Sequence, residues 1–235
     1  MPIFTIGHSN HSIETFVSLL QQQGVTAVAD VRSSPFSRRL PQFNQTLLKN
    51  SLKAEKIAYV FLGDQLGARP QDPDCYVEGK ALYPRIAATD AFAMGLERLA
   101  KGARQHQIAL MCAEQDPITC HRAILVSRHL KSRHLQAAGV EIQHILKTGE
   151  LESQEHLEQR LVKLHRLRDR LPLLEDSAET AVGAQLELFS PVASEAGGSY
   201  GVPLTELIEQ AYELQGDRIA YVEQQESDAA YEQAS

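Results

Sequence analysis

Two kinds of hydrophobic pattern alternate along the first 150 residues of the chain. Short apolar runs are typical of buried strands, and apolar positions three or four residues apart are typical of helices packed on one face. The runs predict strands at 3–6, 25–31, 57–62, 107–112 and 140–146. The helical spacing predicts helices at 13–23, 44–56, 89–105 and 117–133.

This alternation of strands and helices predicts an α/β fold. A parallel sheet needs a crossover between successive strands, and helices of this length supply it. We therefore expect a single three-layer domain with a mostly parallel sheet of about five strands and right-handed crossovers. In such a sheet, ligands bind at the carboxyl ends of the strands.

The pattern changes beyond residue 150. Leucines at helical spacing predict a helix over 153–171, which Pro172 ends. Residues 172–202 are small, polar and rich in Gly and Ser, as in a linker. We expect an α/β domain at 1–171, a linker at 172–202, and a short C-terminal helix with a flexible acidic tail at 203–235.

Charge is distributed unevenly. The formal net charge is −7, and residues 203–235 alone hold eight acidic residues and one basic residue. Residues 117–171 hold ten Lys and Arg against six Asp and Glu, together with six of the nine histidines. This asymmetry hints at nucleic-acid contact, although a solvated helix face followed by a disordered tail explains it equally well.

Cysteine content and hydropathy bear on the cellular compartment. Three cysteines do not form a disulfide framework, which favours a reducing environment. The chain has no apolar run of the roughly 20 residues that a membrane span needs, and its first residues do not look like a secretion signal. These features predict a cytoplasmic protein.

Chemically capable side chains follow the first strand. Gly7 would let the backbone approach a ligand, His8 offers a base, and Ser9 offers a hydrogen-bond donor. The alternative is that these residues only make a turn.

The second strand ends in charged residues. Asp30 and Arg32 fall on the same side of the strand and can pair. Alternatively Arg32, Arg38 and Arg39 surround an anion such as phosphate together with nearby serines, among them Ser34. Arg38 and Arg39 are equally compatible with exposure to solvent.

The fourth strand leads into the richest stretch, residues 110–122. Asp116 is expected as the N-cap of the next helix and Pro117 as its first residue. Glu114 suits a general acid or base, or holds an arginine. We expect Cys120 in the second turn of that helix as a buried, inert thiol, with His121 and Arg122 turned toward the ligand.

The two cysteines of this stretch, Cys112 and Cys120, are eight positions apart, unlike the short spacings of common zinc sites. We expect neither a disulfide nor a metal here. A thiol or metal-dependent protein, using these cysteines with His121, stays an alternative.

Four motifs in order resemble the domain-of-unknown-function family numbered 488. They are Thr5-Ile6-Gly7-His8-Ser9, Asp30-Val31-Arg32 with Pro35 and Ser37-Arg38, Leu62-Gly63 with Leu66-Gly67, and Cys112-Ala113-Glu114 with Cys120-His121-Arg122. The resemblance spans roughly residues 3–146 and implies a compact α/β domain, with no settled reaction. The third motif departs from the paired glycines expected there.

A short peptide in the linker suggests a partner. Gln185, Leu186, Leu188 and Phe189 resemble the motif with which bacterial proteins bind the DNA sliding clamp. Apolar anchors on a flexible segment can fill a pocket of such a partner, or can dock on their own domain.

The sequence thus predicts a cleft where strand ends meet. The leading hypothesis is an enzyme, a hydrolase or transferase, acting on a phosphate-bearing substrate such as a nucleotide or nucleic acid, with the cofactor unknown. His8, Glu114 and His121 would move protons. The remaining candidates would bind substrate: Gly7, Ser9, Asp30, Arg32, Ser34, Arg38, Cys112, Cys120 and Arg122. The alternative is a non-catalytic nucleic-acid-associated protein tethered to a sliding clamp.

Overall fold

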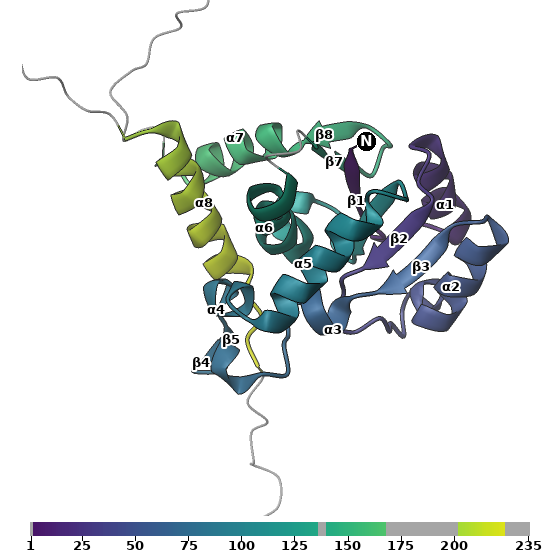
Figure 1. Cartoon of the computed structure of the whole chain (residues 1–235), viewed down its shortest axis with the longest axis horizontal. Helices are drawn as coiled ribbons and strands as arrows, with labels where there is room; N and C mark the ends of the chain where they lie inside the picture. Colours follow the sequence, from purple (N-terminus) through teal and green to yellow (C-terminus); the bar gives the residue numbers. More distant parts are fainter. Residues whose placement is uncertain (1, 136–139, 168–201, 224–235) are drawn as a thin grey trace, which may run out of the picture.

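A twisted sheet forms the centre of the molecule (Figure 1). The computed structural model describes residues 2–135, 140–167 and 202–223. Within them the main sheet has six strands in the order β3-β2-β6-β1-β7-β8. Their bounds are β1 Ile3–Gly7, β2 Ala27–Asp30, β3 Ala58–Phe61, β6 Ile108–Cys112, β7 Ile142–Ile145 and β8 Leu151–Ser153. All neighbouring pairs are parallel except β7 and β8.

Helices cover both faces of this sheet. They are α1 Ile13–Gln22, α2 Gln45–Ala54, α3 Gly63–Leu66, α4 Tyr83–Ala87, α5 Asp90–Gly102, α6 Arg128–Leu130, α7 Gln154–Leu164 and α8 Leu204–Ile219. Helices α1 and α2 contribute to one core cluster, while α4, α5, α7 and α8 contribute to the other. The three-layer α/β prediction is confirmed.

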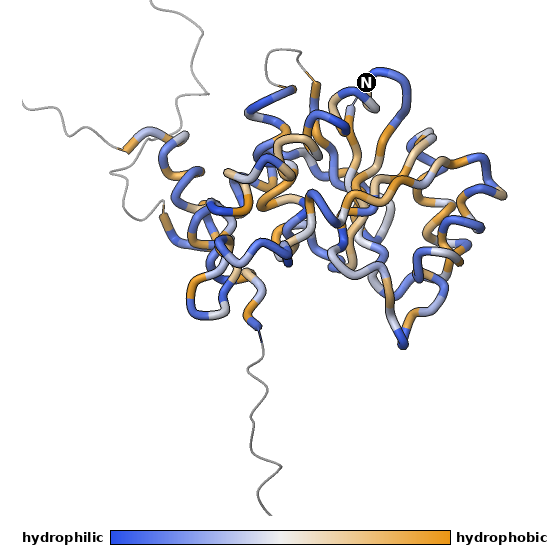
Figure 2. The backbone as a smooth tube through the Cα atoms, turned by 60° about the horizontal axis from the view of Figure 1, so that its bottom comes forward, coloured by the Kyte–Doolittle hydropathy of each residue, from blue (hydrophilic) through white to orange (hydrophobic). Residues whose placement is uncertain are grey.

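Alternation along the strands divides the core into these two clusters. In β6, Ile108, Leu110 and Cys112 face the cluster shared with α5, whereas Ala109 and Met111 face the cluster shared with α1 and α2. The fully buried strand is therefore apolar on both faces, as expected for the interior of a parallel sheet. In Figure 2 the backbone tube is accordingly mostly orange, the colour of hydrophobic residues, along the central strands.

The predicted strands and helices are present, with shifted bounds, and the sheet has one strand more. Strand β8 was not predicted, because its three residues are too short to show a period. A hairpin of β4 (Tyr76–Val77) and β5 (Lys80–Ala81) also lies in the region between the third strand and α5. No helix of the described residues is long and apolar enough to cross a lipid bilayer.

The helix predicted over 117–133 is interrupted, which corrects the placement of Cys120. Asp116 does cap a turn, accepting a hydrogen bond from Ile118 N, but this 3₁₀ turn ends at Thr119. Cys120 is extended, with φ −129° and ψ 136°. Its carbonyl accepts the N–H groups of Ala123 and Ile124, so a second helical segment begins after it. Cys120 therefore precedes this helix instead of lying in its second turn.

The C-terminal helix is part of the same core. Leu207, Ala211 and Tyr212 of α8 are buried in the cluster that includes α5 and α7, and Gln215 donates to Ile118 O at 2.7 Å. The sequence predicted the helix but not this packing. Nearly all of the predicted linker and most of the acidic tail lie outside the described residues.

Candidate functional site

The ends of β1 and β6 are joined by backbone contacts. His8 N donates to Cys112 O and Ser9 N to Ala113 O, which extends the pairing beyond the strands. A Cβ atom on Gly7 would lie 1.8 Å from Glu114 O. Gly7 is therefore needed for the approach of the Glu114 backbone, which corrects its predicted role in admitting a ligand.

At the end of β2, Arg32 and Asp30 form the predicted pair. Arg32 Nε and Nη2 donate to the two Asp30 carboxylate oxygens at 2.9 and 2.6 Å, and Nη2 also reaches Phe43 O at 2.9 Å. Tyr59 Oη donates to the same carboxylate. Both members of the pair are buried. Because most of its donors are engaged by the protein, Arg32 has little capacity left to hold an anion.

His8 holds this arginine and is a poor candidate for the predicted base. Its Nδ1–H donates to Ser9 O, which leaves the Nε2 lone pair facing Arg32 Nη1 at 3.3 Å. The ring stacks on Phe43 with centroids 4.3 Å apart. Burial, together with the charge of Arg32, lowers the pKa of His8 to about 4 and keeps the ring neutral.

Four chemically active side chains converge beyond the end of β6. One sulfur, nitrogen or oxygen atom each from Cys112, Glu114, Cys120 and His121 lies within 4.8 Å of the other three. Cys120 Sγ donates to Glu114 Oε2 at 2.9 Å, and Cys112 Sγ lies 3.5 Å from His121 Nδ1. Both cysteines carry free thiols. The break in the helix at Cys120 is what turns its side chain toward Glu114.

The two thiols of this cluster differ in acidity. Burial raises the pKa of Cys112 well above its usual range. Burial also opposes ionisation of Cys120, but the hydrogen bond from Cys112 and the positive Arg122 hold its pKa well below the usual range. Burial of the Glu114 carboxylate, together with the repulsion it would meet from an ionised Cys120, raises the pKa of Glu114. Cys120 is buried as expected, its lowered pKa favours the thiolate, and its inertness stays a prediction.

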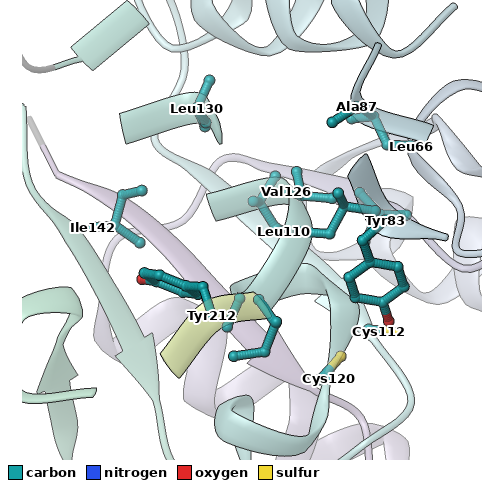
Figure 3. Packing of buried hydrophobic residues seen from close by; sticks show 14 of the residues in the cluster. Leu66, Tyr83, Ala87, Leu110, Cys112, Cys120, Val126, Leu130, Ile142 and Tyr212 are labelled. Atoms are coloured by element: carbon teal, nitrogen blue, oxygen red, sulfur yellow. The ribbon is translucent and has the colours of Figure 1, made fainter. Parts of the chain in front are cut away.

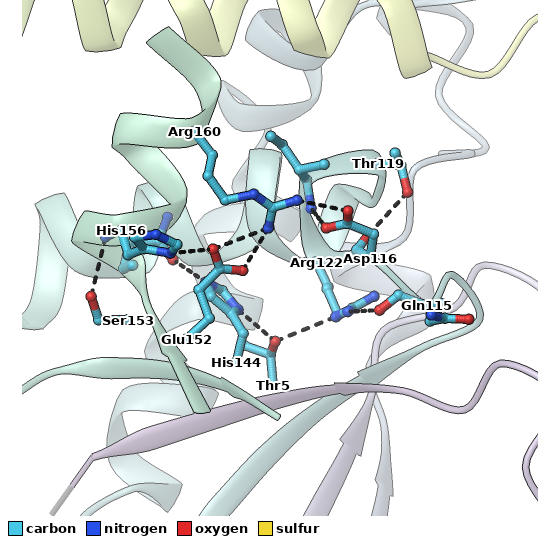
Figure 4. Close-up of polar contacts among 12 residues, drawn as sticks. Thr5, Gln115, Asp116, Thr119, Arg122, His144, Glu152, Ser153, His156 and Arg160 are labelled. Atoms are coloured by element: carbon cyan, nitrogen blue, oxygen red, sulfur yellow. Dashed lines mark hydrogen bonds and ion pairs between the residues drawn. The ribbon is translucent and has the colours of Figure 1, made fainter. Parts of the chain in front are cut away.

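Arg122 is directed into the protein. It is fully buried, and its guanidinium donates to Thr5 Oγ1, Glu114 O and Gln115 O. Figure 4 shows it beneath the turn that carries Gln115 and Asp116. The prediction that it holds a substrate anion is replaced by a structural role, since its donors satisfy buried carbonyl groups of the turn.

A pocket of about 590 Å³ opens over this region. Of the predicted site residues it is lined by Arg32, Ser34, Cys112, Glu114 and His121. Gly7, His8, Ser9, Asp30, Arg38, Cys120 and Arg122 are not among its lining residues. Arg38 and Arg39 are exposed. The structure thus brings together the ends of β2 and β6 at the pocket. His8 contacts Arg32 but does not line the pocket.

Other residues of the pocket came from segments without a regular pattern. Arg69, Tyr83 and Tyr221 line it, and the Arg69 guanidinium carbon lies 4.2 Å from the centre of the Tyr221 ring. Figure 3 shows Tyr83 beside Cys112 and Cys120. Gly67 supports this arrangement, since a Cβ there would lie 2.4 Å from Ser33 Oγ, which accepts the Arg69 N–H. The Leu66-Gly67 motif was the available signal for this loop.

A second depression, of about 940 Å³, lies beside β8. Its polar lining includes Asp116, Glu152, His156 and Arg160 (Figure 4). Arg160 bridges Asp116 and Glu152 at 2.7 Å each, and Glu152 Oε1 lies 2.7 Å from His156 Nδ1. These groups satisfy one another, so they form a structural network.

Three of the basic side chains of residues 117–171 are engaged by carboxylates in the fold. Arg128 pairs with Glu209, Lys131 with Glu155 and Glu158, and Arg160 with the two carboxylates just described. The side chains predicted for clamp binding, Gln185, Leu186, Leu188 and Phe189, lie outside the described residues.

Comparison with protein families gives one match. Residues 12–129 match the family described as "Domain of unknown function DUF488". This segment contains the loop of Arg32, the pocket loop at Arg69 and the whole Cys112–His121 turn. No curated protein and no solved structure matches the chain significantly.

Proposed function

The chain belongs to the DUF488 family, as its motifs suggested, and the description of that family names no activity. From the pocket we propose that the protein is an enzyme acting on a phosphate-bearing substrate. The observation that carries this proposal is that one pocket is lined both by groups that can bind phosphate, Arg69 and Ser34, and by groups that can transfer a proton, Glu114 and His121. A partly open pocket of this size, lined by both polar and apolar side chains, suits a small molecule such as a nucleotide.

Arg69 is the residue best suited to bind the phosphate. It is exposed, and within the described residues its guanidinium makes no ion pair with a carboxylate. Stacking on Tyr221 holds the guanidinium plane in place and leaves its N–H edge free for a bidentate contact. The Ser34 hydroxyl lines the same pocket and supplies a neutral donor.

Glu114 is the group best placed to transfer a proton. Its backbone is fixed by the contact with Gly7 and by Arg122, while its carboxylate reaches both the pocket and Cys120 Sγ. A positioned carboxylate of this kind can protonate a leaving group or activate a nucleophile. His121 lies beside it on the pocket wall.

The ion pairs of residues 117–171 reduce the number of cationic side chains that a long nucleic acid could contact. Binding along a phosphate backbone requires several cationic side chains that are free to replace counterions. Arg128, Lys131 and Arg160 are instead engaged by carboxylates. Attachment to a sliding clamp through 185–189 stays a separate prediction.

Binding and turnover test the proposal in two steps. Calorimetric titration with a panel of nucleoside phosphates and sugar phosphates should find a ligand whose affinity falls at least about tenfold in Arg69→Gln, the loss of roughly one charge-assisted contact. Arg39→Gln is the matched control, because Arg39 is exposed and does not line the pocket. The ligand found should be converted by the wild-type protein, and Glu114→Gln should bind it without turnover.

Two results would contradict this function. The phosphate site is wrong if Arg39→Gln weakens binding as much as Arg69→Gln does, or if no compound of the panel binds. The catalytic assignment is wrong if Glu114→Gln turns the ligand over at the wild-type rate.

A further inference from the structure

A set of donor atoms typical of metal sites lies at the edge of the pocket, which Cys112, Glu114 and His121 line. Cys112 ends β6, the turn at 113–119 reverses the chain, and Cys120 and His121 return to the same point, with Glu114 beside them. Their spacing in sequence does not resemble a zinc motif. The turn and the extended backbone at Cys120 bring the donor atoms together in the fold. We propose that the thiolates of Cys112 and Cys120 and Nδ1 of His121 bind a zinc ion.

The orientation of His121 supports this assignment. Its Nε2 lies 2.9 Å from Val31 O, and a carbonyl oxygen can only accept, so Nε2 carries the hydrogen. In the neutral ring Nδ1 then has a free lone pair, and it faces Cys112 Sγ at 3.5 Å. Metal-binding histidines characteristically donate their second N–H to a carbonyl or carboxylate in this way, which fixes the ring and its tautomer.

Charge balance also fits a divalent ion. On binding, each thiol releases its proton, and the two thiolates neutralise the 2+ charge while the imidazole stays neutral. The three ligands are at most 7 % exposed, so a neutral cluster suits their surroundings better than separate charges would. Arg122 N–H points at Cys120 Sγ over 3.4 Å and would stabilise the thiolate. Two sulfurs with an imidazole favour zinc over the hard ions magnesium and calcium.

The fourth position of the ion would face the pocket. Glu114 is the exposed member of the cluster, so its carboxylate can yield this position to water or to an oxygen of the substrate. Three protein ligands and one exchangeable position are the arrangement of catalytic zinc sites. A catalytic role of the ion rests on the proposed function, because the ion would polarise a substrate bound in the same pocket. Binding of the ion itself does not depend on the proposed function.

Metal content of the full-length protein, purified without added metal or chelator, tests the inference. We expect about one zinc per chain in the wild type and at least about tenfold less in Cys112→Ser, Cys120→Ser and His121→Asn. Cys75→Ala should keep the zinc, since Cys75 is equally buried but lies outside the cluster. Glu114→Gln should also keep it.

A second measurement on the wild type remains decisive if a cysteine variant fails to fold. After removal of zinc by a chelator, added Co²⁺ should produce the thiolate-to-cobalt absorption of a four-coordinate sulfur site, and zinc should abolish it by displacement. The inference is overturned if the wild type binds neither ion at stoichiometric level, or if Cys75→Ala loses zinc as Cys120→Ser does. Loss of zinc in Glu114→Gln would overturn the exchangeable position.

The zinc inference and the proposed phosphate-binding function can be rejected separately. Stoichiometric zinc in a protein that binds no phosphate-bearing compound would keep this inference and reject the proposed function. Phosphate binding that depends on Arg69 in a protein that takes up no zinc would do the reverse.

Discussion

At the scale of single residues, buried polar side chains form a continuous chain of hydrogen bonds through the core, in which each group donates to the next. Arg122 donates to Thr5 Oγ1, so the Thr5 hydroxyl donates to His144 Nδ1 and leaves His144 Nε2–H to donate to Gln154 Oε1. Gln154 Nε2 then donates to Tyr212 Oη. Each group has a partner, so the chain of bonds fixes side-chain positions from β1 to α8.

Removal of Arg122 should be severely destabilising. Arg122→Leu leaves the carbonyls of Glu114 and Gln115 without their buried donor, at roughly 1–3 kcal/mol for each lost partner. We expect the free energy of unfolding in urea to fall by about 3 kcal/mol or more.

Arg128→Leu is the matched control, since Arg128 is in a partly exposed ion pair with Glu209 and such pairs contribute at most about 1 kcal/mol. Equal losses in the two variants would show that the inward orientation of Arg122 contributes nothing specific.

At the scale of elements, α8 extends the core across a long stretch of sequence. Its residues Leu207, Ala211 and Tyr212 are buried, while Leu204 and Leu214 of the same helix are about half exposed. The segment after it, through Tyr221 and Val222, forms one wall of the pocket and bridges to Lys80. Helix α8 is thus connected both to the core and to the candidate site.

The two leucines of α8 should therefore differ in their contribution to stability. Leu207→Ala should lower the free energy of unfolding by roughly 2–5 kcal/mol, the usual range for a buried leucine, in one cooperative transition. Leu204→Ala should cost less than about 1 kcal/mol. If Leu207→Ala has no effect on the main transition in urea, α8 does not share the core.

At the scale of the whole molecule, buried neutral histidines make stability depend on pH. Burial, aided by the charge of Arg122, lowers the pKa of His144 to about 3 from the ordinary 6.5. Between these values the unfolded chain binds a proton that the folded protein does not. The contribution of His144 is therefore fully present above pH 6.5 and is lost as the pH falls toward 3.

Urea unfolding of metal-free protein at several pH values measures this effect. From pH 6 to pH 4.5 the wild type should lose up to about 1.4 kcal/mol per pH unit more than His144→Asn, which has no titrating ring. Parallel pH profiles of the two proteins would show that His144 is protonated in the folded state as well.

Local patterns predicted the sheet and part of the site. The apolar runs placed the strand ends, and alternation in β2 was sufficient to pair Asp30 with Arg32. The predicted orientation of Arg122 was wrong, because the orientation depends on a helix break at Cys120 that no local preference indicated. Arg69 and Tyr83 were missed, since they lie in loops and short helices whose position is set by distant contacts.

The central position of β1 has a consequence for how the chain acquires its structure. Phe4 pairs with Ala109 and Ile3 with Ile142, so both neighbours of this first strand lie more than a hundred residues along the chain. Contacts so distant in sequence are entropically costly to bring together and slow to form. During synthesis β1 must therefore wait, apolar on both faces and without partners, until β6 and β7 have emerged. That interval is when the nascent chain is most exposed to misassociation with other chains.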